Sequence, residues 1–403
     1  MPTAVIVDAI RTPGGKRNGK LSGWHPADLL AEVLKALAER SSLDPALVDD
    51  VITGCVMQVG NQSLNVGRNA VLAAGWPETV PATTIDRQCG SSQQSMHFAA
   101  QGVIAGAYDV VVAAGVEVMS TTPMGASVTP GSFPFGPQAF ERYADSEYFG
   151  FKGLIPQGVS AEVIADRWEL TRDDLDAFGL RSQQRAAVAR DEGRFDNEII
   201  AVAARPRDKE TGELIATDEV VRSDEGIRDS SMESLGKLKP AFVPEEQGGK
   251  VTAANSSQIT DGASGVLIMS EEKAAALGLT PRARFHTFAL AGVDPVTMLT
   301  GPIPSTQKVL ERSGLSIDDI DLFEVNEAFA SVVLAWQKEL GVDAEKVNVN
   351  GGAVALGHPL GASGTKLMAT LLNELERTGG RYGLQTMCEG GGLANATIVE
   401  RMG

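Results

Sequence analysis

The last third of the chain repeats the pattern of the first, and this repeat limits the possible folds more than any other feature. The segment ERSSLDPALVDDVITGC at residues 39–55 is echoed, with a few residues of slack, by ERSGLSIDDIDLFEVN at residues 311–326. In both regions short apolar runs alternate with apolar residues at helical spacing, which predicts strands alternating with helices. We therefore expect two related α/β halves with a mostly parallel sheet.

Individual segments agree with this interpretation. Residues 5–9 (VIVDA) and 110–115 (VVVAAG) are continuous apolar runs, as expected for strands buried on both faces. Residues 27–40 predict an amphipathic helix. The chain has 403 residues. Single hydrophobic cores stop growing at about 250–300 residues, so two or three packed units are expected.

The segment 121–250 interrupts the alternation. It opens with the turn-rich stretch TTPMGASVTPGSFPFG, and Thr171 and Asp174 have the spacing of a capping box ahead of a helix. We interpret it as an inserted loop domain, either a lid or a substrate-binding excursion, with a surface elaboration as the alternative. The expected division is an N-terminal half (1–120, completed by about 251–270), the loop domain (121–250) and a C-terminal half (271–403).

Charge and composition exclude several classes of protein. The formal net charge of −17 argues against non-specific binding to nucleic acid or to an anionic membrane. The three cysteines are too few for a disulfide framework, and the four histidines show no zinc-ligand spacing, so no metal is expected. The chain has no signal peptide pattern and no stretch near the roughly 20 apolar residues of a membrane span, which favours a cytoplasmic location without membrane insertion.

Cys89 is the first candidate for chemistry. It lies in DRQCGSSQQSM, between a predicted strand and a predicted helix. A cysteine at a helix N-terminus lies at the positive end of the helix dipole, which favours the nucleophilic thiolate. The same position also suits an inert buried cysteine.

Two glycine-rich blocks hold further candidates. His358 lies in NVNGGAVALGHPLGASGTK, where Pro359 suits the first position of a helix, and a neutral histidine could take a thiol proton. Cys388 ends a predicted strand in MCEGGG, where the backbone N–H of Gly390 could bind an oxyanion. A loop histidine and a packed cysteine are the structural alternatives.

Asn326, in NEAFA, follows another predicted strand. Its side chain could donate a hydrogen bond to developing charge or could cap the next helix. In open α/β sheets, sites gather beyond the carboxyl ends of strands. We therefore expect Cys89, Asn326, His358 and Cys388 to share one edge of the sheet.

These blocks resemble the signature blocks of the thiolase family. DRQCGSSQQ, VTAANSSQITDGAS (251–264), EVNEAFA, NVNGGAVALGHPLGASG and MCEGGG occur in the family's order. The resemblance implies a five-layer αβαβα fold, built from two duplicated halves with an inserted loop domain over the coenzyme A site. It also implies an acyltransferase whose substrates are coenzyme A thioesters, with no permanently bound cofactor, and a homodimer or homotetramer.

The resemblance also implies residue roles. Cys89 would accept the acyl group as a thioester, His358 would deprotonate Cys89, and Cys388 would exchange a proton with the carbon that is joined or released. Asn326 would place a water that completes one oxyanion hole, and the backbone N–H groups of Cys89 and Gly390 would form the other.

The coenzyme A contacts and the acyl chain follow from looser matches. Ser257 would line the pantetheine site, and Arg228 would lie near the nucleotide. Short-chain biosynthetic thiolases usually carry His-Met where this chain has Pro156-Gln157. This difference favours a degradative enzyme acting on longer 3-ketoacyl-CoA in fatty acid or steroid side-chain β-oxidation.

Four alternatives stay open. The first is a short-chain biosynthetic acetoacetyl-CoA thiolase. The second is a decarboxylating condensing enzyme similar to ketoacyl synthases, which would need a second active-site histidine. The third is a Cys–His acyl hydrolase that uses Cys89, His358 and Asn326. The fourth is a non-catalytic lipid carrier, which would have no reason to hold two cysteines and a histidine together.

Overall fold

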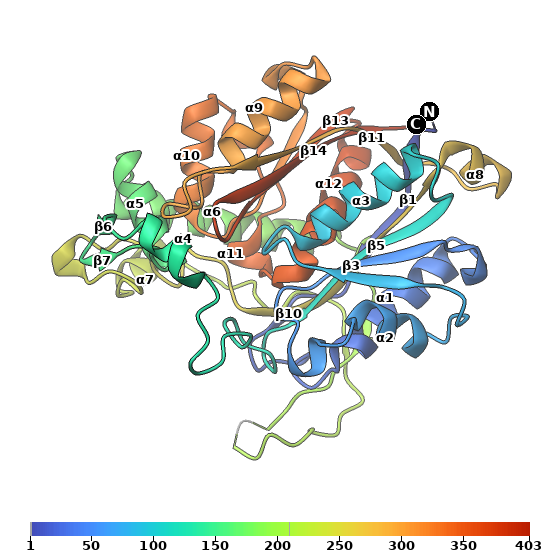
Figure 1. The fold of residues 1–403 in the computed structure, drawn as a ribbon, viewed down its shortest axis with the longest axis horizontal. Helices are drawn as coiled ribbons and strands as arrows, with labels where there is room; N and C mark the ends of the chain where they lie inside the picture. Colours follow the sequence, from blue (N-terminus) through green and yellow to red (C-terminus); the bar gives the residue numbers. More distant parts are fainter. Residues whose placement is uncertain (1, 209) are drawn as a thin grey trace.

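Strands from both ends of the chain join in one sheet of ten strands (Figure 1). The structure is a computed structural model that describes residues 2–208 and 210–403. The strands of the sheet are β1 (Ala4–Arg11), β2 (Gly15–Lys16), β3 (Asp50–Gly54), β4 (Ala82–Ile85), β5 (Val110–Val118), β10 (Thr260–Ser270), β11 (Ala283–Gly292), β12 (Leu322–Val325), β13 (Tyr382–Glu389) and β14 (Leu393–Arg401). Their order is β12-β13-β14-β11-β1-β10-β5-β3-β4, and β2 pairs with β10.

The two halves repeat one pattern of strand directions. In the N-terminal half β1, β10 and β5 are antiparallel neighbours, and β5, β3 and β4 are parallel. In the C-terminal half β11, β14 and β13 are antiparallel neighbours, and β13 and β12 are parallel. The expectation of a mostly parallel sheet is therefore wrong. β14 follows β13 through residues 390–392, and so short a turn can join only antiparallel neighbours.

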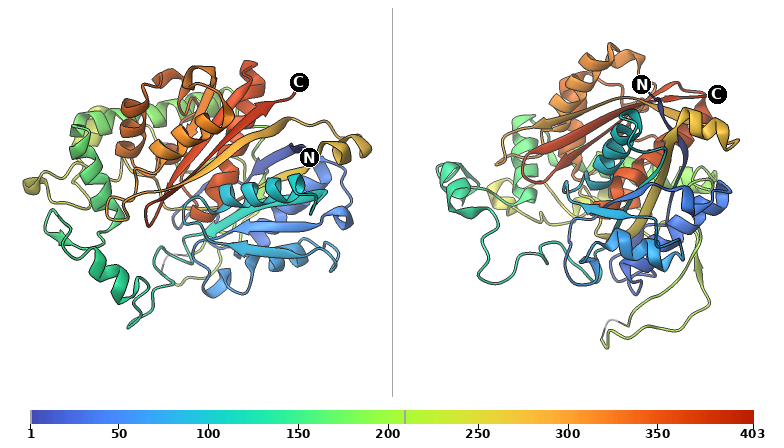
Figure 2. Two further views of the ribbon diagram at one scale, coloured as in Figure 1. Left: turned by 45° about the horizontal axis from the view of Figure 1, so that its top comes forward. Right: turned by 45° about the vertical axis from the view of Figure 1, so that its right-hand side comes forward.

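Helices complete the layers. The helices outside segment 121–250 are α1 (Pro26–Arg40), α2 (Val66–Ala73), α3 (Ser91–Ile104), α8 (Glu271–Ala276), α9 (Pro302–Ser313), α10 (Ala330–Leu340), α11 (Ala353–Leu356) and α12 (Ser363–Thr378). α3 and α12 pack together between the two halves of the sheet (Figure 2). α1 lies on the outer face of β10 and β5 with α2 beside it, and α9 lies on the outer face of β11 and β14 with α10 beside it. The five-layer αβαβα architecture is confirmed.

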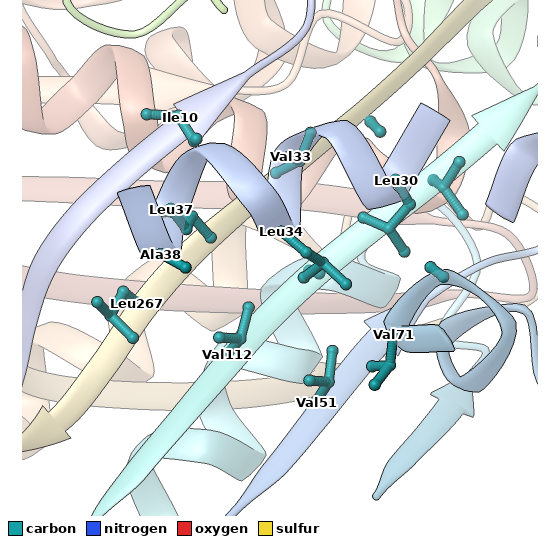
Figure 3. Close-up of a cluster of buried hydrophobic side chains, with 14 of the residues drawn as sticks. Ile10, Leu30, Val33, Leu34, Leu37, Ala38, Val51, Val71, Val112 and Leu267 are labelled. Atoms are coloured by element: carbon teal, nitrogen blue, oxygen red, sulfur yellow. The ribbon is translucent and has the colours of Figure 1, made fainter. Parts of the chain in front are cut away.

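Helix α1 shows how an outer layer is held. It begins one residue earlier than predicted, at Pro26, and His25 caps it. Leu30, Leu34 and Leu37 recur at helical spacing and face β5 and β10 (Figure 3). Burying each leucine contributes about 1.5–3 kcal/mol. The apolar face of α1 thus covers the outer face of β5 and β10.

Segment 121–250 packs mainly against the C-terminal helices. Its elements are α4 (Gly136–Arg142), β6 (Glu147–Tyr148), β7 (Phe151–Lys152), α5 (Gln157–Arg167), α6 (Arg172–Asp191), β8 (Val202–Ala203), β9 (Val220–Val221) and α7 (Met232–Gly236). α6 begins with the predicted capping box between Thr171 and Asp174. α5 and α6 pack on α10, and α6 also packs on α11, next to His358.

Over residues 2–208 and 210–403, none of the helices is both long enough and apolar enough to cross a membrane.

Candidate active site

Cys89 lies at a sharp turn between β4 and α3. Gln88 has φ of 48°, in the left-handed region that residues other than glycine rarely adopt. Gly90 precedes the first residue of α3, so the thiol stands just outside the helix N-terminus. The thiol is buried in an apolar cluster that also contains Leu360 and Met387. Cys89 is thereby packed against the neighbours of both other predicted catalytic residues.

The Cys89 side chain is a neutral thiol in this structure. Burial and the charge of Glu389 raise the pKa of Cys89 to about 12, although hydrogen bonds from Gln157 and from the Gly390 N–H lower it. The expectation that the helix terminus would favour the thiolate is wrong, because desolvation outweighs the nearby dipoles. A nucleophile of this kind needs a base to take its proton.

His358 follows a glycine turn. α11 ends at Leu356, and Gly357 has φ of 80°, which a side chain would strain. Pro359 does not open a helix as predicted. It precedes a 3₁₀ turn (Leu360–Ala362), and α12 starts only at Ser363. The Ser363 hydroxyl donates to the Pro359 carbonyl oxygen at 2.9 Å, which closes this turn on His358.

The hydrogen bonds of His358 define its tautomer. Nδ1 lies 2.5 Å from Ser363 Oγ. The single Ser363 hydroxyl proton is used in the bond to Pro359, so Nδ1 must carry the proton and Nε2 must be free to accept one. Burial, followed by the charge of Lys366, lowers the pKa of His358 to about 3. The ring is therefore neutral near pH 7, with its basic nitrogen available.

Asn326 holds the other side of this imidazole. Its amide nitrogen lies 3.4 Å from His358 Nε2, and its backbone N–H donates to the Thr386 carbonyl oxygen on β13 at 3.0 Å. The structure excludes the alternative that Asn326 caps a helix, because Phe329 precedes α10. Asn326 Oδ1 is buried without a partner.

A small cavity of about 10 Å³ lies next to this asparagine. Asn326, Ser363 and Lys366 contribute to its walls. A space of this size holds about one water molecule. The geometry thus suits the water that the family resemblance associates with Asn326.

Cys388 is the penultimate residue of β13 and is fully buried. Burial raises the pKa of Cys388 well above its ordinary value, and the charge of Cys89 raises it further. Gly390 lies in the turn after β13, and its N–H lowers the pKa of Cys89. Cys89, Cys388 and Gly390 are therefore electrostatic neighbours, and Leu360, two residues after His358, packs in the same cluster as Cys89.

Ser257 and Arg228 lie on an adjoining surface. The Ser257 N–H donates to the Ala328 carbonyl oxygen at 2.9 Å, two residues after Asn326. The exposed Arg228 side chain donates to Gln258 Oε1 at 3.2 Å. Arg228 and Arg190 line a surface pocket of about 320 Å³. The two predicted residues are neighbours through Gln258, but neither contacts the cysteines.

Sequence reasoning missed three side chains that touch the site. Ser363 Oγ contacts His358 Nδ1, Lys366 donates to the Leu356 and Gly357 carbonyl oxygens, and Gln157 lowers the pKa of Cys89. Ser363 and Lys366 lie in the same glycine-rich block as His358, but nothing in their spacing showed which way they point. Gln157 stood out only as a departure from the family pattern.

Within the described ranges, no cluster of three or more His, Cys, Asp or Glu side chains is arranged to hold a metal ion.

Comparisons with known proteins agree with the sequence blocks. The chain matches the family models for the thiolase N-terminal domain over residues 4–272 and the thiolase C-terminal domain over residues 279–401. It is 50% identical to the steroid 3-ketoacyl-CoA thiolase FadA6 of Mycobacterium tuberculosis, over 100% of this chain and 95% of that protein. It is 45% identical to the 3-ketoacyl-CoA thiolase of Psychrobacter cryohalolentis, over 99% of this chain and 98% of that protein.

A solved structure gives the same answer for the fold. The crystal structure of the Bacillus anthracis acetyl-CoA acetyltransferase superposes with a TM-score of 0.86 at 38% identity, covering 100% of this chain and 99% of that one. The sequence blocks, the five layers and the matches to both family models lead to one conclusion: the chain belongs to the thiolase family of acyltransferases.

Proposed function

We propose that this protein is a degradative thiolase, which cleaves 3-ketoacyl-CoA with free coenzyme A through an acyl-Cys89 thioester. The main supporting observation is that His358 contacts Asn326, while Leu360, two residues after His358, packs in one cluster with Cys89. A covalent intermediate divides a difficult carbon–carbon cleavage into two easier steps. The same groups run the reverse reaction, the Claisen condensation of an acyl-CoA with acetyl-CoA.

In the first half-reaction, His358 Nε2 takes the Cys89 thiol proton and the sulfur attacks the 3-keto carbon of the substrate. The C2–C3 bond then breaks, and its electron pair leaves on C2 as the enolate of acetyl-CoA. Cys388 transfers its thiol proton to C2. Acetyl-CoA departs, and the shortened acyl group remains on Cys89.

In the second half-reaction, the coenzyme A thiol gives its proton to the Cys388 thiolate and attacks the acyl carbonyl. The Cys89 sulfur leaves and recovers its proton from His358. Acyl-CoA departs, and the resting protonation states return. The neutral tautomer of His358 supports this role, because with the proton on Nδ1 the lone pair of Nε2 can accept the thiol proton.

Two oxyanion sites follow from the same arrangement. The N–H groups of Cys89 and Gly390 would bind the oxygen of the acyl group on Cys89. His358, once protonated, and the water placed by Asn326 would bind the thioester oxygen of the enolate. Each well-placed donor lowers the barrier by about 3–4 kcal/mol.

Coenzyme A would bind along the surface that carries Ser257 and Arg228. Ser257 would contact the pantetheine arm, because its backbone is bonded to Ala328, two residues along the chain from Asn326. Arg228, together with Arg190 in the 320 Å³ pocket, would offer positive charge to the phosphates. Coenzyme A thioesters enter as substrates, and we propose no permanently bound cofactor.

The relatives' names favour the longer, degradative substrates over acetoacetyl-CoA alone. Two relatives at 45–50% identity are named for 3-ketoacyl-CoA, one of them for steroid 3-ketoacyl-CoA. Pro156 precedes α5, and Gln157, the first residue of that helix, lowers the pKa of Cys89, at the position where His-Met pairs mark short-chain biosynthetic enzymes. Substrates would then come from fatty acid or steroid side-chain β-oxidation.

We further propose the three-part organisation into residues 1–120 with about 251–270, 121–250 and 271–403, and a cytoplasmic homodimer or homotetramer. β4 lies at the outer edge of the ten-stranded sheet and is only partly buried. An unpaired edge strand of this kind is usually protected by pairing. Light scattering coupled to size-exclusion chromatography would measure the assembly.

One assay tests the proposed reaction. The protein is incubated with acetoacetyl-CoA and with longer 3-ketoacyl-CoA substrates, with and without free coenzyme A, and the ketoacyl enolate absorbance is followed. We expect cleavage only with free coenzyme A and a higher kcat/KM for the longer chains. Cleavage without coenzyme A would instead identify a Cys–His hydrolase. A clear preference for acetoacetyl-CoA would identify the short-chain biosynthetic enzyme.

A further inference from the structure

Glu389 is a buried carboxyl group that the proposed reaction does not use. It lies at the end of β13, between Cys388 and Gly390, with no exposed surface. Among residues 2–208 and 210–403, neither of its side-chain oxygens finds a hydrogen-bond partner. An ionised carboxylate in such a place is strongly unfavourable, so the geometry calls for a protonated acid or a special role.

The Glu389 carboxyl group lies next to the start of α3. Gly90, the residue after Cys89, has no room for a side chain, because a Cβ there would overlap Glu389 Oε1. The same Cβ would come within 2.9 Å of Asn395 Nδ2 on β14. Alternation along β13 places Met387 on the same face, and Met387 packs in one cluster with Cys89. The Glu389 side chain therefore lies on the same face of β13 as the cluster that contains Cys89.

Three buried amide side chains lie between α3 and the strand that ends at Glu389. Gln93, Gln385 and Asn395 each donate an amide N–H to a neighbour but leave the carbonyl oxygen without a donor. These three residues occupy the layer between α3 and the strands β13 and β14. The Asn395 amide nitrogen lies beside Gly90 together with the Glu389 carboxyl group, but it donates to the Gly90 carbonyl oxygen at 3.2 Å.

The charges around Glu389 act in both directions. Burial raises the pKa of Glu389 to about 8, the Arg87 guanidinium lowers it, and the Asp86 carboxylate raises it. The N-terminus of α3 also favours a negative charge, but no N–H of that helix donates to the carboxyl oxygens. Burial thus favours the protonated acid near neutral pH, and the carboxylate forms on the alkaline side.

We propose that Glu389 is a positioning residue for both catalytic thiols: protonated, it permits the Cys89 and Cys388 thiolates to form, and ionised on the alkaline side, it suppresses them. The charge of Glu389 opposes a negative charge on Cys89 and on Cys388 alike. The proposal rests on the proposed function, because that function gives the two thiols their roles. It adds an alkaline limit that is set by a residue which never touches the substrate.

The first experiment follows the alkylation of Cys89 by iodoacetamide from pH 7 to pH 9.5, with the modified peptide identified by mass spectrometry. Wild-type protein is compared with Glu389→Gln, whose neutral amide mimics the protonated acid. The ratio of the variant rate to the wild-type rate should grow by about tenfold across this range, because a unit charge a few ångströms away shifts a thiol pKa by at least about one unit. A ratio that stays constant with pH overturns the proposal.

Glu162→Gln is the matched control. Glu162 is equally buried, but it accepts N–H groups from Lys250 and Val251 and does not act on either thiol. Its ratio to wild type should not change with pH. A tenfold growth in this control as well would show that any buried carboxyl has the effect, and would also overturn the assignment to Glu389.

A second measurement does not depend on cysteine reactivity. The pKa of Glu389 is raised by folding, so the unfolded chain releases this proton first, and the carboxyl destabilises the fold increasingly between about pH 4.5 and pH 8. The melting temperature of Glu389→Gln should exceed that of wild type by a margin that grows from pH 5 to pH 8. A margin that shrinks or reverses would mean that Glu389 is ionised in the fold. Neither measurement requires turnover, so failure of the thiolase assay would leave both readouts interpretable.

Discussion

Lys366 donates a 2.8 Å hydrogen bond to the carbonyl oxygen of Gly357, and this bond holds the turn from which His358 projects. A second bond, of 2.6 Å, runs from the same ammonium group to Leu356. The ammonium is buried, and burial lowers the pKa of Lys366 to about 8 despite the nearby acids Asp224, Glu198 and Glu324. Burial disfavours the charged form of this lysine. Its two hydrogen bonds hold the loop that carries His358 in place, and we call Lys366 the brace of that loop.

Replacing this brace should weaken both the fold and catalysis. Lys366→Met leaves two buried carbonyl oxygens without donors, which should reduce the free energy of unfolding by about 2–4 kcal/mol. Displacement of His358 should lower kcat by about tenfold or more. Lys308→Met is the control, because the exposed Lys308 also donates to a backbone carbonyl, that of Leu290, far from the site. Equal effects of the two variants on kcat would contradict the assigned role.

Removal of the nucleophile should abolish acyl transfer. Cys89→Ala should form no acetyl-enzyme with acetyl-CoA and should lose at least about a thousandfold in thiolysis rate. Intact-protein mass spectrometry measures the acetyl adduct directly. Cys55→Ser is the control, because Cys55 is equally buried but faces Glu117. An acetyl adduct that persists in Cys89→Ala would place the covalent chemistry on another residue.

The second thiol should affect only the carbon–carbon step. Cys388→Ser should still acquire an acetyl group on Cys89, because His358 alone activates that sulfur. Its cleavage of 3-ketoacyl-CoA should fall by about 10²–10⁴-fold, because the weaker acid cannot deliver the proton to C2 efficiently. Measuring acetylation and cleavage on the same preparation separates the two steps. Near-normal cleavage by Cys388→Ser would exclude Cys388 as the acid/base.

Loss of the hydroxyl that sets the histidine tautomer should slow the reaction without weakening binding. Ser363→Ala removes the acceptor for Nδ1–H of His358, so the ring can also adopt the tautomer whose Nε2 is already protonated. We expect kcat to fall by about 10–100-fold with KM little changed. Ser160→Ala removes another buried hydroxyl, bonded to Val296, and serves as the control. A rise in KM at constant kcat would point to substrate binding instead.

A buried ion pair should make the fold sensitive to acid. Arg11 is fully buried and bonds Asp224 through two nitrogens at 2.7 and 3.0 Å. Burial alone would raise the pKa of Asp224, but the charges of Arg11 and Lys366 outweigh it and lower that pKa. The stability that this carboxylate contributes is therefore present above its unfolded pKa of about 3.9, and is lost as pH falls through the lower folded value.

Two variants test this pair. Arg11→Met leaves two buried acids, Asp224 and Glu198, without their positively charged partner. It should lower the free energy of unfolding by about 3–5 kcal/mol at pH 7. The stability gap between wild type and Asp224→Asn should be largest near neutral pH and should shrink below pH 4. Chemical denaturation at several pH values measures both, with the exposed Glu311→Gln as the control. A gap that widens on acidification would mean that folding raises the pKa of Asp224 instead of lowering it.

Much of the architecture could be predicted from local patterns. Apolar runs such as residues 110–115 became buried strands, and the capping box at Thr171 and Asp174 began a helix as expected. The order of the signature blocks led to the thiolase family, which the family models confirm. These features depend on the spacing of neighbouring residues, and a one-dimensional chain records that spacing directly.

Other properties were decided only by tertiary structure. Residue spacing did not predict that β10 and β14 run antiparallel to their neighbours. It also did not predict the neutral state of Cys89 or the positions of Ser363, Lys366 and Glu389 around the site. Each of these properties depends on which side chains are buried by residues distant in the chain, and on which groups those residues place a few ångströms away. Desolvation and charge–charge energies change steeply over such distances. The sequence therefore identifies the titratable residues, whereas only the packed fold determines their protonation.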